Sequence, residues 1–421
     1  MATLVRPVAA GDTLAERFLE VRTLTRDIAA PLSDADATIQ PHPDASPAKW
    51  HLAHTSWFFE TFVLRDHVPG YGLFDERWSY LFNSYYEGEG ERHPRARRGM
   101  LSRPSLAEIL AYRDHVDEAL VAALPLLPPR VRELVELGLN HEQQHQELML
   151  MDMLATLAEN PLAPAAWERE APSDPQSAPP IGGVLGRGGV VEIGHSGSGF
   201  AFDSEGPRHQ QLLRPYELAD RLVSNGEWLR FIAEGGYEQP EHWLADGWTW
   251  VQENGILAPL YWRREGEDWQ RFGLDGLRPV DPAEPVCHIS YYEADAFARW
   301  AKARLPTEAE WEAVAATLDP NDGNFLDEAG PVRPLAASGS GARQMFGDVW
   351  EWTMSAFSPY PGFKPAEGTV GEYNGKFMSG QFVLRGGSCA TPRGHVRARY
   401  RNFFYPHQRW QFSGLRLARD V

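Results

Sequence analysis

The chain has 421 residues, more than one ordinary folded core holds, so we expect two domains. Its 58 acidic side chains against 40 basic ones give a formal net charge of −18, which argues against nucleic acid or an anionic membrane surface as a partner. Two cysteines, Cys287 and Cys389, are too few for a disulfide framework. With no export signal at the N-terminus and no apolar stretch near the ~18 residues of a membrane span, we expect a cytoplasmic protein.

The first 160 residues have the pattern of a helical bundle. Apolar side chains recur at spacings of three and four residues in three long stretches, at 14–28, 105–124 and 131–157. Residues 161–184 are rich in Pro, Ala and Ser and show no sustained period. We therefore expect a four-helix domain over residues 1–160, followed by a linker over residues 161–184.

The amino-acid composition changes again after the linker. Residues 185–421 are rich in Gly, Trp and Tyr and contain short β-type runs such as 190–194 and 382–388. Only two helices stand out, at 224–235 and 290–303. This half is predicted to be an α+β domain, so the chain as a whole combines an α domain with an α+β domain.

The strongest chemical signal is the run HEQQHQE, residues 141–147, within a helical pattern. At about 100° per residue, His141 and His145 lie about 40° apart on one face of the helix, so both imidazoles can reach one metal ion. The flanking sequence is apolar, and two buried imidazoles are hard to satisfy without a metal. The pair therefore predicts a metal site.

The same run also fits the H-E-x-x-H signature of zinc peptidases, in which Glu142 would be the general base. Such enzymes need a third ligand, either a His six residues on or a downstream Glu in its own helix motif, and neither pattern is evident before the next histidine, His195. Upstream, the segment 46–60 offers His51 and His54, spaced three residues apart on a predicted helix. Either could complete a three-histidine site with open positions, as octahedral Fe(II) allows. Glu147 points away from both ligands, which favours a packing or supporting role.

At this point several motifs together resemble a known family. SPAKWHLAHTSWFFE (46–60), SYYEGEGERHPRARRGMLSRPS (84–105) and HEQQHQELML (141–150) resemble the DinB-like domain of the ergothioneine-type iron sulfoxide synthases. The C-terminal half is similar to the formylglycine-generating-enzyme fold, a C-type-lectin-like α+β domain. It carries four motifs of that fold, which are RLPTEAEWE (304–312), GDVWEWT (347–353), VLRGGSC (383–389) and SGLRLARD (413–420).

The resemblance implies a ligand set and a reaction. The family's metal ligands fall on His54, His141 and His145, which leaves His51 a packing or supporting residue. The implied cofactor is Fe(II), and the implied substrates are O₂, hercynine (Nα-trimethylhistidine) and a cysteine-type thiol. The enzyme would form a C–S bond to the imidazole and oxidise the sulfur to a sulfoxide, as in ergothioneine biosynthesis.

The resemblance also implies the substrate contacts. Hercynine would lie against Asn402, Phe403 and Phe404, whose aromatic faces suit a trimethylammonium cation, with Gln144 near its imidazole. The carboxylate of the thiol substrate would bind two arginines three residues apart, Arg95 and Arg98. The preceding pair, Tyr85 and Tyr86, would supply a proton to the developing intermediate.

The sequence differs from two related groups of enzymes at positions that bear on the expected reaction and substrate. Formylglycine-generating enzymes use a pair of cysteines near the C-terminus, and only Cys389 lies there, so we do not expect sulfatase activation. Relatives that consume γ-glutamylcysteine carry an acidic residue and an arginine shortly after the Arg-Asn pair, where this chain has Phe404 and Gln408. We therefore expect free cysteine rather than γ-glutamylcysteine as the thiol.

Three alternatives stay open at this stage. One is a zinc peptidase built on HEQQH, and another is a binding protein whose lectin-like half captures a small cation. A third is an ovothiol-type enzyme that attacks another imidazole carbon. Such relatives usually carry an appended methyltransferase domain, and because the sequence shows none after residue 421, we expect the ergothioneine-type reaction.

Overall fold

The computed structural model describes residues 13–168, 177–366, 371 and 374–421, and the chain divides into two compact units. The first consists mainly of the residues up to Trp167, and Asp327–Pro331 belongs with it. The second consists mainly of the residues from 177 onward. Part of the predicted linker, residues 169–176, lies outside the described residues.

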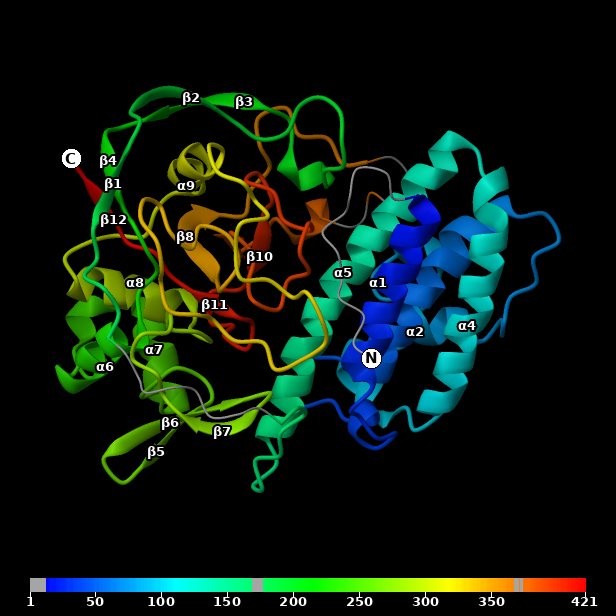
Figure 1. The fold of residues 1–421 in the computed structure, drawn as a ribbon, viewed down its shortest axis with the longest axis horizontal. Helices are drawn as coiled ribbons and strands as arrows, with labels where there is room; N and C mark the ends of the chain where they lie inside the picture. The colour runs from blue at the N-terminus through cyan, green and yellow to red at the C-terminus, as the bar shows by residue number, and fades with distance from the viewer. Residues whose placement is uncertain (1–12, 169–176, 367–370, 372–373) are drawn as a thin grey trace. The chain divides into compact units, whose positions relative to one another are not determined.

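The first unit is a helical bundle, as predicted. Its long helices are α1 (Leu14–Ala29), α2 (Ala48–Phe59), α4 (Leu106–Ala123) and α5 (Pro129–Ala158). They lie side by side (Figure 1), with α2 packed against both α4 and α5, and α1 packed against α5. A π-helical segment, Glu60–Arg65, continues α2, and a short helix α3 (Trp78–Phe82) follows it.

Local sequence sets the ends of these helices, while tertiary packing defines the role of α2. Helices α1 and α4 begin with capping boxes, Thr13 with Glu16 and Ser105 with Glu108, which satisfy the first free backbone N–H groups. All twelve residues of α2 are buried, so this helix has no solvent face. It is the central helix of the bundle, and it carries His51 and His54.

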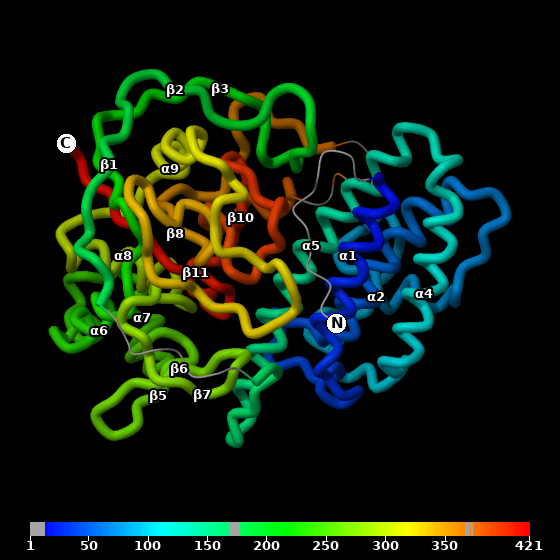
Figure 2. The backbone as a smooth tube through the Cα atoms, viewed as in Figure 1, coloured from blue at the N-terminus to red at the C-terminus, as the bar shows by residue number. Residues whose placement is uncertain are grey.

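The second unit is an α+β domain with small sheets. The four-stranded sheet has the order β10 (Asn402–Phe404), β9 (Phe382–Arg385), β8 (Trp350–Ala356) and β11 (Ser413–Gly414). A three-stranded sheet contains β1 (Gly183–Gly186), β4 (Tyr216–Ala219) and β12 (Ala418–Asp420). The others are β2 (Gly189–Ile193) with β3 (His209–Leu213), and β5 (Trp262–Glu265), β6 (Asp268–Gly273) and β7 (Gly276–Pro279). All pairings are antiparallel except β8 with β11, which lie side by side in Figure 2.

The prediction of two helices in this unit was incomplete. The predicted pair are α6 (Asn225–Ala233) and α8 (Tyr291–Trp300), but α7 (Ala245–Asn254) and α9 (Glu308–Ala315) are also present. Helix α7 has no side-chain cap and α9 has only eight residues, so neither has a long amphipathic pattern. The capping box of α9, Thr307 with Glu310, was a signal that could have revealed it.

Buried ion pairs join the four motifs of this second unit. Arg385 of β9 contacts Glu308 and Glu312 of α9 at 2.8 and 3.0 Å. Arg416 contacts Glu351 of β8 at 2.9 Å, and both side chains are almost fully buried. Each of these pairs therefore constrains which elements pack together, because a buried charge is tolerated only beside its partner.

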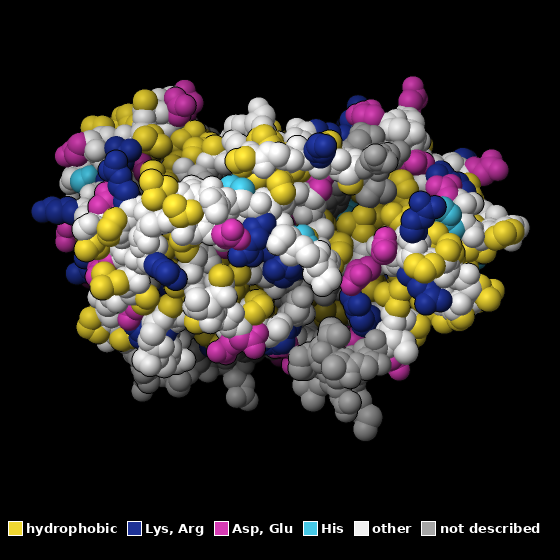
Figure 3. All heavy atoms as spheres, turned by 90° about the horizontal axis from the view of Figure 1, so that it is seen from above, with side chains coloured by type: hydrophobic (Ala, Val, Ile, Leu, Met, Phe, Trp, Pro, Cys, Tyr) yellow, Lys and Arg dark blue, Asp and Glu magenta, His cyan; other side chains and the backbone are white. Residues whose placement is uncertain are grey.

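The surface agrees with the composition. On the face shown in Figure 3, Lys and Arg side chains are scattered among acidic and apolar ones, and those of the described residues form no continuous basic patch there. Among the described residues, none of the helices combines the length and the apolar character needed to span a bilayer.

A close approach between α2 and α5 generates a prediction. A methyl group at Gly138 of α5 would overlap the Phe59 ring of α2 and touch Phe58, whose ring lies 4.9 Å from that of His141. Gly138→Ala should therefore destabilise the helical unit by about 1–3 kcal/mol, although alanine normally favours a helix. Denaturant unfolding followed by circular dichroism measures this. Gly72→Ala is the control, since its added methyl group meets no atom within 4 Å; an equal effect of the two substitutions would contradict the packing argument.

Candidate metal centre

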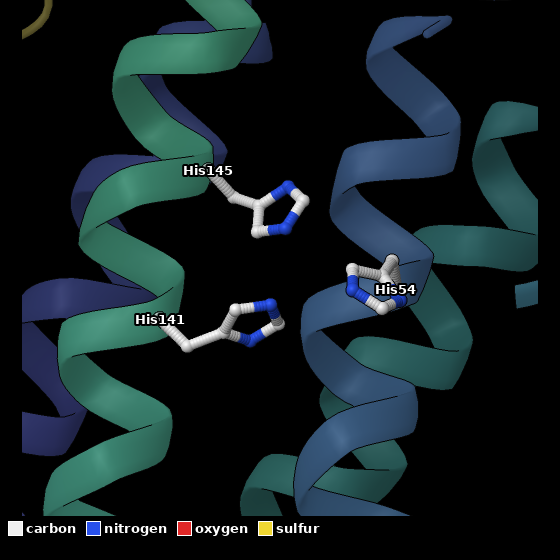
Figure 4. Close-up of side chains that lie close together, drawn as sticks. All are labelled: His54, His141 and His145. Atoms are coloured by element: carbon white, nitrogen blue, oxygen red, sulfur yellow. The ribbon is translucent and has the colours of Figure 1, made fainter. Parts of the chain in front are cut away.

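Three imidazoles converge inside the helical bundle. His141 and His145 project from neighbouring turns of α5 toward His54 of α2 (Figure 4). One ligand atom from each of the three residues lies within 4.8 Å of the other two. Helices α2 and α5 therefore bring together His54, His141 and His145, the three residues that the family resemblance indicated.

The cluster is buried, which keeps the rings neutral. His54, His141 and His145 are 0, 1 and 8% exposed. Burial lowers the pKa of His141 to about 3, and burial together with the neighbouring imidazoles lowers the pKa values of His54 and His145 well below the ordinary range. A neutral imidazole keeps a lone pair on one nitrogen, which is the form that binds a metal ion.

The surroundings of His54 fit a metal ligand. Its Nδ1 donates a hydrogen bond to the backbone carbonyl of Phe82 at 2.6 Å, which leaves the lone pair on Nε2. That Nε2 atom is buried and meets no hydrogen-bond partner among the described residues. The rings of Trp50 and Trp57, one turn before and one turn after, stack on the imidazole and hold its plane. A buried acceptor without a partner is costly, so a metal ion would satisfy it.

His51 lies beside the cluster rather than in it. Its Nδ1 is 2.8 Å from Nδ1 of His145, and its Nε2 is 3.0 Å from a carboxylate oxygen of Asp152. The supporting role expected for His51 thus has a defined geometry. Sequence reasoning did not single out Asp152, although its position seven residues after His145 on the same helix was a signal, because that spacing returns to the same face.

Glu142 points away from the three imidazoles into the core of the bundle. Its two oxygens accept from Arg22 and Arg113, each at 2.9 Å, and all three side chains are nearly inaccessible to solvent. Burial alone would raise the pKa of this carboxyl, but the two guanidinium groups outweigh it and hold the value at about 2. Glu142 is therefore a permanently charged partner in a buried ion-pair network.

The two predicted carboxylate-binding arginines have different environments. Arg95 is exposed and donates to the backbone carbonyl of Asp44. Arg98 is 3% exposed, stacks on the Trp50 ring at 3.3 Å and donates to Ser46 Oγ at 2.9 Å. Burial, together with the nearby positive charge of Arg95, lowers the pKa of Arg98. The carboxylate of Asp152 acts on Arg98 in the opposite direction, but within the described part of the chain no carboxylate lies within ion-pair distance of this guanidinium.

The predicted tyrosines and Gln144 also belong to the helical unit. Tyr86 is fully buried, and its ring lies 5.6 Å from Trp57, which in turn stacks on His54. Tyr85 is half-buried and packs against Tyr86 at 4.8 Å. Gln144 is half-buried on α5, one position before His145.

The predicted hercynine contacts lie in the second unit. Asn402, Phe403 and Phe404 form strand β10, and all three are half-buried. The Phe403 ring stacks on Phe357 with a centroid distance of 4.1 Å, and Phe404 packs edge-on against Trp410. Strand β10 is the last strand of the four-stranded sheet, and the two rings lie on opposite faces of it because successive residues of a strand point to opposite sides.

Comparison with known families agrees with this architecture. Residues 17–149 match the model of the DinB superfamily. Residues 168–326 and 320–421 match the model of the sulfatase-modifying factor enzyme 1-like domain. Together these matches cover both units, so the predicted fold class of a DinB-like domain and a formylglycine-generating-enzyme-like domain is confirmed.

Three relatives match across almost the whole length of the chain. A hercynine oxygenase of Mycobacterium tuberculosis is 36% identical over 413 residues, which cover 92% of this chain and 94% of the relative. That of Mycolicibacterium smegmatis is 35% identical, with 98 and 100% of the two chains covered, and that of Mycolicibacterium thermoresistibile is 34% identical, with 97 and 95% covered. Similarity at this level over both domains, in the same order, establishes that this chain belongs to the hercynine oxygenase family.

Proposed function

We propose that the protein is an Fe(II)-dependent sulfoxide synthase that uses O₂ to join the sulfur of cysteine to the imidazole of hercynine, a step in ergothioneine biosynthesis. The observation that carries this proposal is the buried cluster of three neutral imidazoles, His54, His141 and His145, in a member of the hercynine oxygenase family. An oxidoreductase of this kind needs a metal ion with open positions for its substrates. Three histidine ligands leave such positions.

The metal would be held by one imidazole from α2 and two from α5. A bound Fe(II) would supply the redox chemistry for O₂ and would stabilise a thiolate by direct coordination. The protein contributes a dry, aromatic enclosure around the imidazoles, built by Trp50, Trp57 and Phe58. Excluding water in this way protects reactive species from side reactions.

Arg98 supports the proposed thiol substrate. A buried guanidinium with no carboxylate partner is unfavourable, and a substrate carboxylate would compensate its charge. Arg98 stacks on Trp50, and Trp50 stacks on His54 with a centroid distance of 4.5 Å. A carboxylate bound by Arg98 would thus anchor the thiol within the same aromatic stack that holds a metal ligand.

The remaining assignments are proposals drawn from the family pattern. Tyr85 or Tyr86 would donate a proton to the intermediate, and Gln144 would contact the substrate imidazole. The trimethylammonium group would bind at strand β10, where Asn402, Phe403 and Phe404 lie. A quaternary cation cannot donate hydrogen bonds, so aromatic faces suit it better than a polar pocket does.

The peptidase alternative lacks its general base. That mechanism needs a carboxylate facing the metal-bound water, whereas Glu142 is directed into the core and bound by Arg22 and Arg113. For Glu142 to act at the metal, Arg113 and Arg22 would both lose their ion pairs with it, and Arg22 would keep only its pair with Asp117. This geometry favours the oxidoreductase.

Metal binding and activity should be lost together in ligand variants. We expect His54→Ala, His141→Ala and His145→Ala each to abolish iron binding and product formation, while His51→Ala still binds the metal. Iron content after anaerobic reconstitution, followed by addition of O₂, hercynine and cysteine with mass analysis of the product, measures both. Full iron occupancy in His54→Ala would show that the upstream ligand is another residue.

Thiol preference tests the substrate assignment. Phe404 and Gln408 provide no charge for the additional amino and carboxylate groups of γ-glutamylcysteine, and leaving these unpaired costs on the order of several kcal/mol. Steady-state kinetics at saturating hercynine and O₂ should therefore give a higher kcat/KM for cysteine. Arg98→Met should raise the KM for cysteine more than it lowers kcat. A preference of about tenfold or more for γ-glutamylcysteine, about 1.4 kcal/mol, would overturn the assignment.

Glu142 is predicted to matter for folding rather than for chemistry. Glu142→Gln should lower the free energy of unfolding by about 3 kcal/mol, because it leaves two buried guanidinium groups with too little negative charge. Glu136→Gln is the matched control on the same helix, since its pair with Arg17 is about one-third exposed and should be worth less than about 1 kcal/mol. Denaturant unfolding compares the two. A folded, iron-containing Glu142→Gln enzyme that has lost activity by orders of magnitude would instead support a catalytic role.

A further inference from the structure

A chain of hydrogen bonds runs from Asp152 through His51 to His145. His51 Nε2 lies 3.0 Å from Asp152 Oδ2, and His51 Nδ1 lies 2.8 Å from His145 Nδ1. The three side chains are buried, with exposures of 4, 2 and 8%. The backbone N–H of Ser46 donates to the same Asp152 oxygen at 2.7 Å and fixes the carboxylate in place. The arrangement is therefore a buried chain of hydrogen bonds that ends on one of the three clustered imidazoles.

With a neutral His51, the positions of the protons follow from these contacts. Two ring nitrogens 2.8 Å apart need one proton between them, because two lone pairs or two N–H groups would repel each other. A carboxylate only accepts, so the proton between Asp152 and His51 belongs to His51 Nε2. A neutral His51 then has its lone pair on Nδ1 and accepts from His145. His145 therefore carries its proton on Nδ1 and keeps the lone pair on Nε2.

We infer that Asp152 and His51 are positioning residues that select the tautomer and the orientation of His145, so that its Nε2 is available to the metal ion. This inference rests on the proposed metal centre and adds to it the residues that prepare one ligand. His54 reaches the same state by a shorter route, since its Nδ1 donates directly to the Phe82 carbonyl. Both helices thus present an Nε2 lone pair. His54 of α2 does so through a backbone carbonyl, and His145 of α5 does so through the pair Asp152 and His51, which we call the relay.

The relay matters because His145 has a competing tautomer. Without an acceptor at the position of His51 Nδ1, the Nδ1–H of His145 would be buried with no partner, which is unfavourable. Moving the proton to Nε2 would relieve this and would block the atom that binds the metal. Loss of such supporting groups typically weakens metal binding about 10- to 100-fold.

The first test measures metal affinity with Co(II) as the probe, in the full-length protein after removal of metal. Visible absorption and competition with a chelator give the dissociation constant. We expect His51→Phe to raise it by about 10- to 100-fold. His51→Asn is the matched control, since its side-chain oxygen can take the place of Nδ1 as acceptor, and its affinity should stay within about threefold of the original. Thermal unfolding of the metal-free variants reports separately on folding.

A double-mutant comparison tests whether Asp152 acts through His51. Asp152→Leu should weaken Co(II) binding in the otherwise unchanged protein but cause no further loss in the His51→Phe background, since contacting residues in one network are not additive. Equal losses in both backgrounds would overturn the relay. So would unchanged affinity in His51→Phe, or equal losses in His51→Phe and His51→Asn.

A measurement without substitutions covers the case in which a variant does not fold. Imidazole ¹⁵N resonances distinguish protonated from unprotonated ring nitrogens, and the relay requires a proton on Nε2 of His51 and on Nδ1 of His145. The opposite tautomer of His145 would overturn it. If the unchanged protein bound no divalent ion, the proposed metal centre would fail as well, whereas metal binding that is insensitive to His51→Phe would remove the relay alone.

Discussion

The contact between α2 and α5 is the constraint on which the candidate centre depends. His54 comes from one helix and the other two imidazoles from the second, so their convergence requires the helix axes to approach closely. Gly138 permits that approach, because its missing side chain makes room for the Phe59 ring. The complete burial of α2 supplies the driving force, since every face of this helix removes apolar surface from water. The three imidazole rings are thereby buried in the core of the bundle, where a polar group must be neutral and must have a partner.

Charged residues in both units contribute mainly to architecture. In the first unit, Arg22, Glu142 and Arg113 form a buried ion-pair network beside the imidazole cluster. In the second unit, Arg385 and Arg416 likewise form buried ion pairs. Each buried charge is matched, so these residues specify which elements pack together, whereas unmatched partners would be strongly unfavourable. Arg98 differs from all of them because it is buried without a carboxylate partner among the described residues. This contrast is the reason we propose Arg98 as a residue that binds the substrate carboxylate.

The centre also illustrates how a protein prepares a histidine for a metal ion. A neutral imidazole can hold its proton on either nitrogen, and the hydrogen bond made by the second nitrogen decides which one is left for the metal. The Phe82 carbonyl does this for His54. For His145 the acceptor is another imidazole, whose own state depends on a carboxylate. Burial increases the free-energy difference between the two tautomers, since a buried N–H without a protein acceptor cannot form a hydrogen bond to water instead.

The sequence by itself determined the helical identity of the first unit and the pairing of His141 with His145, because both follow from a period of 3.6 residues that is visible without a structure. Residue patterns alone did not choose between His51 and His54. Both lie on a helix with no solvent-exposed face, so only the neighbouring elements distinguish them. His51 contacts Asp152, whereas His54 faces His141 and His145 of α5. The same holds for Arg95 and Arg98, which share a segment but differ in burial. Local periodicity decides which residues share a helix face, whereas the partner of each face is a long-range contact that exists only once the helices have packed.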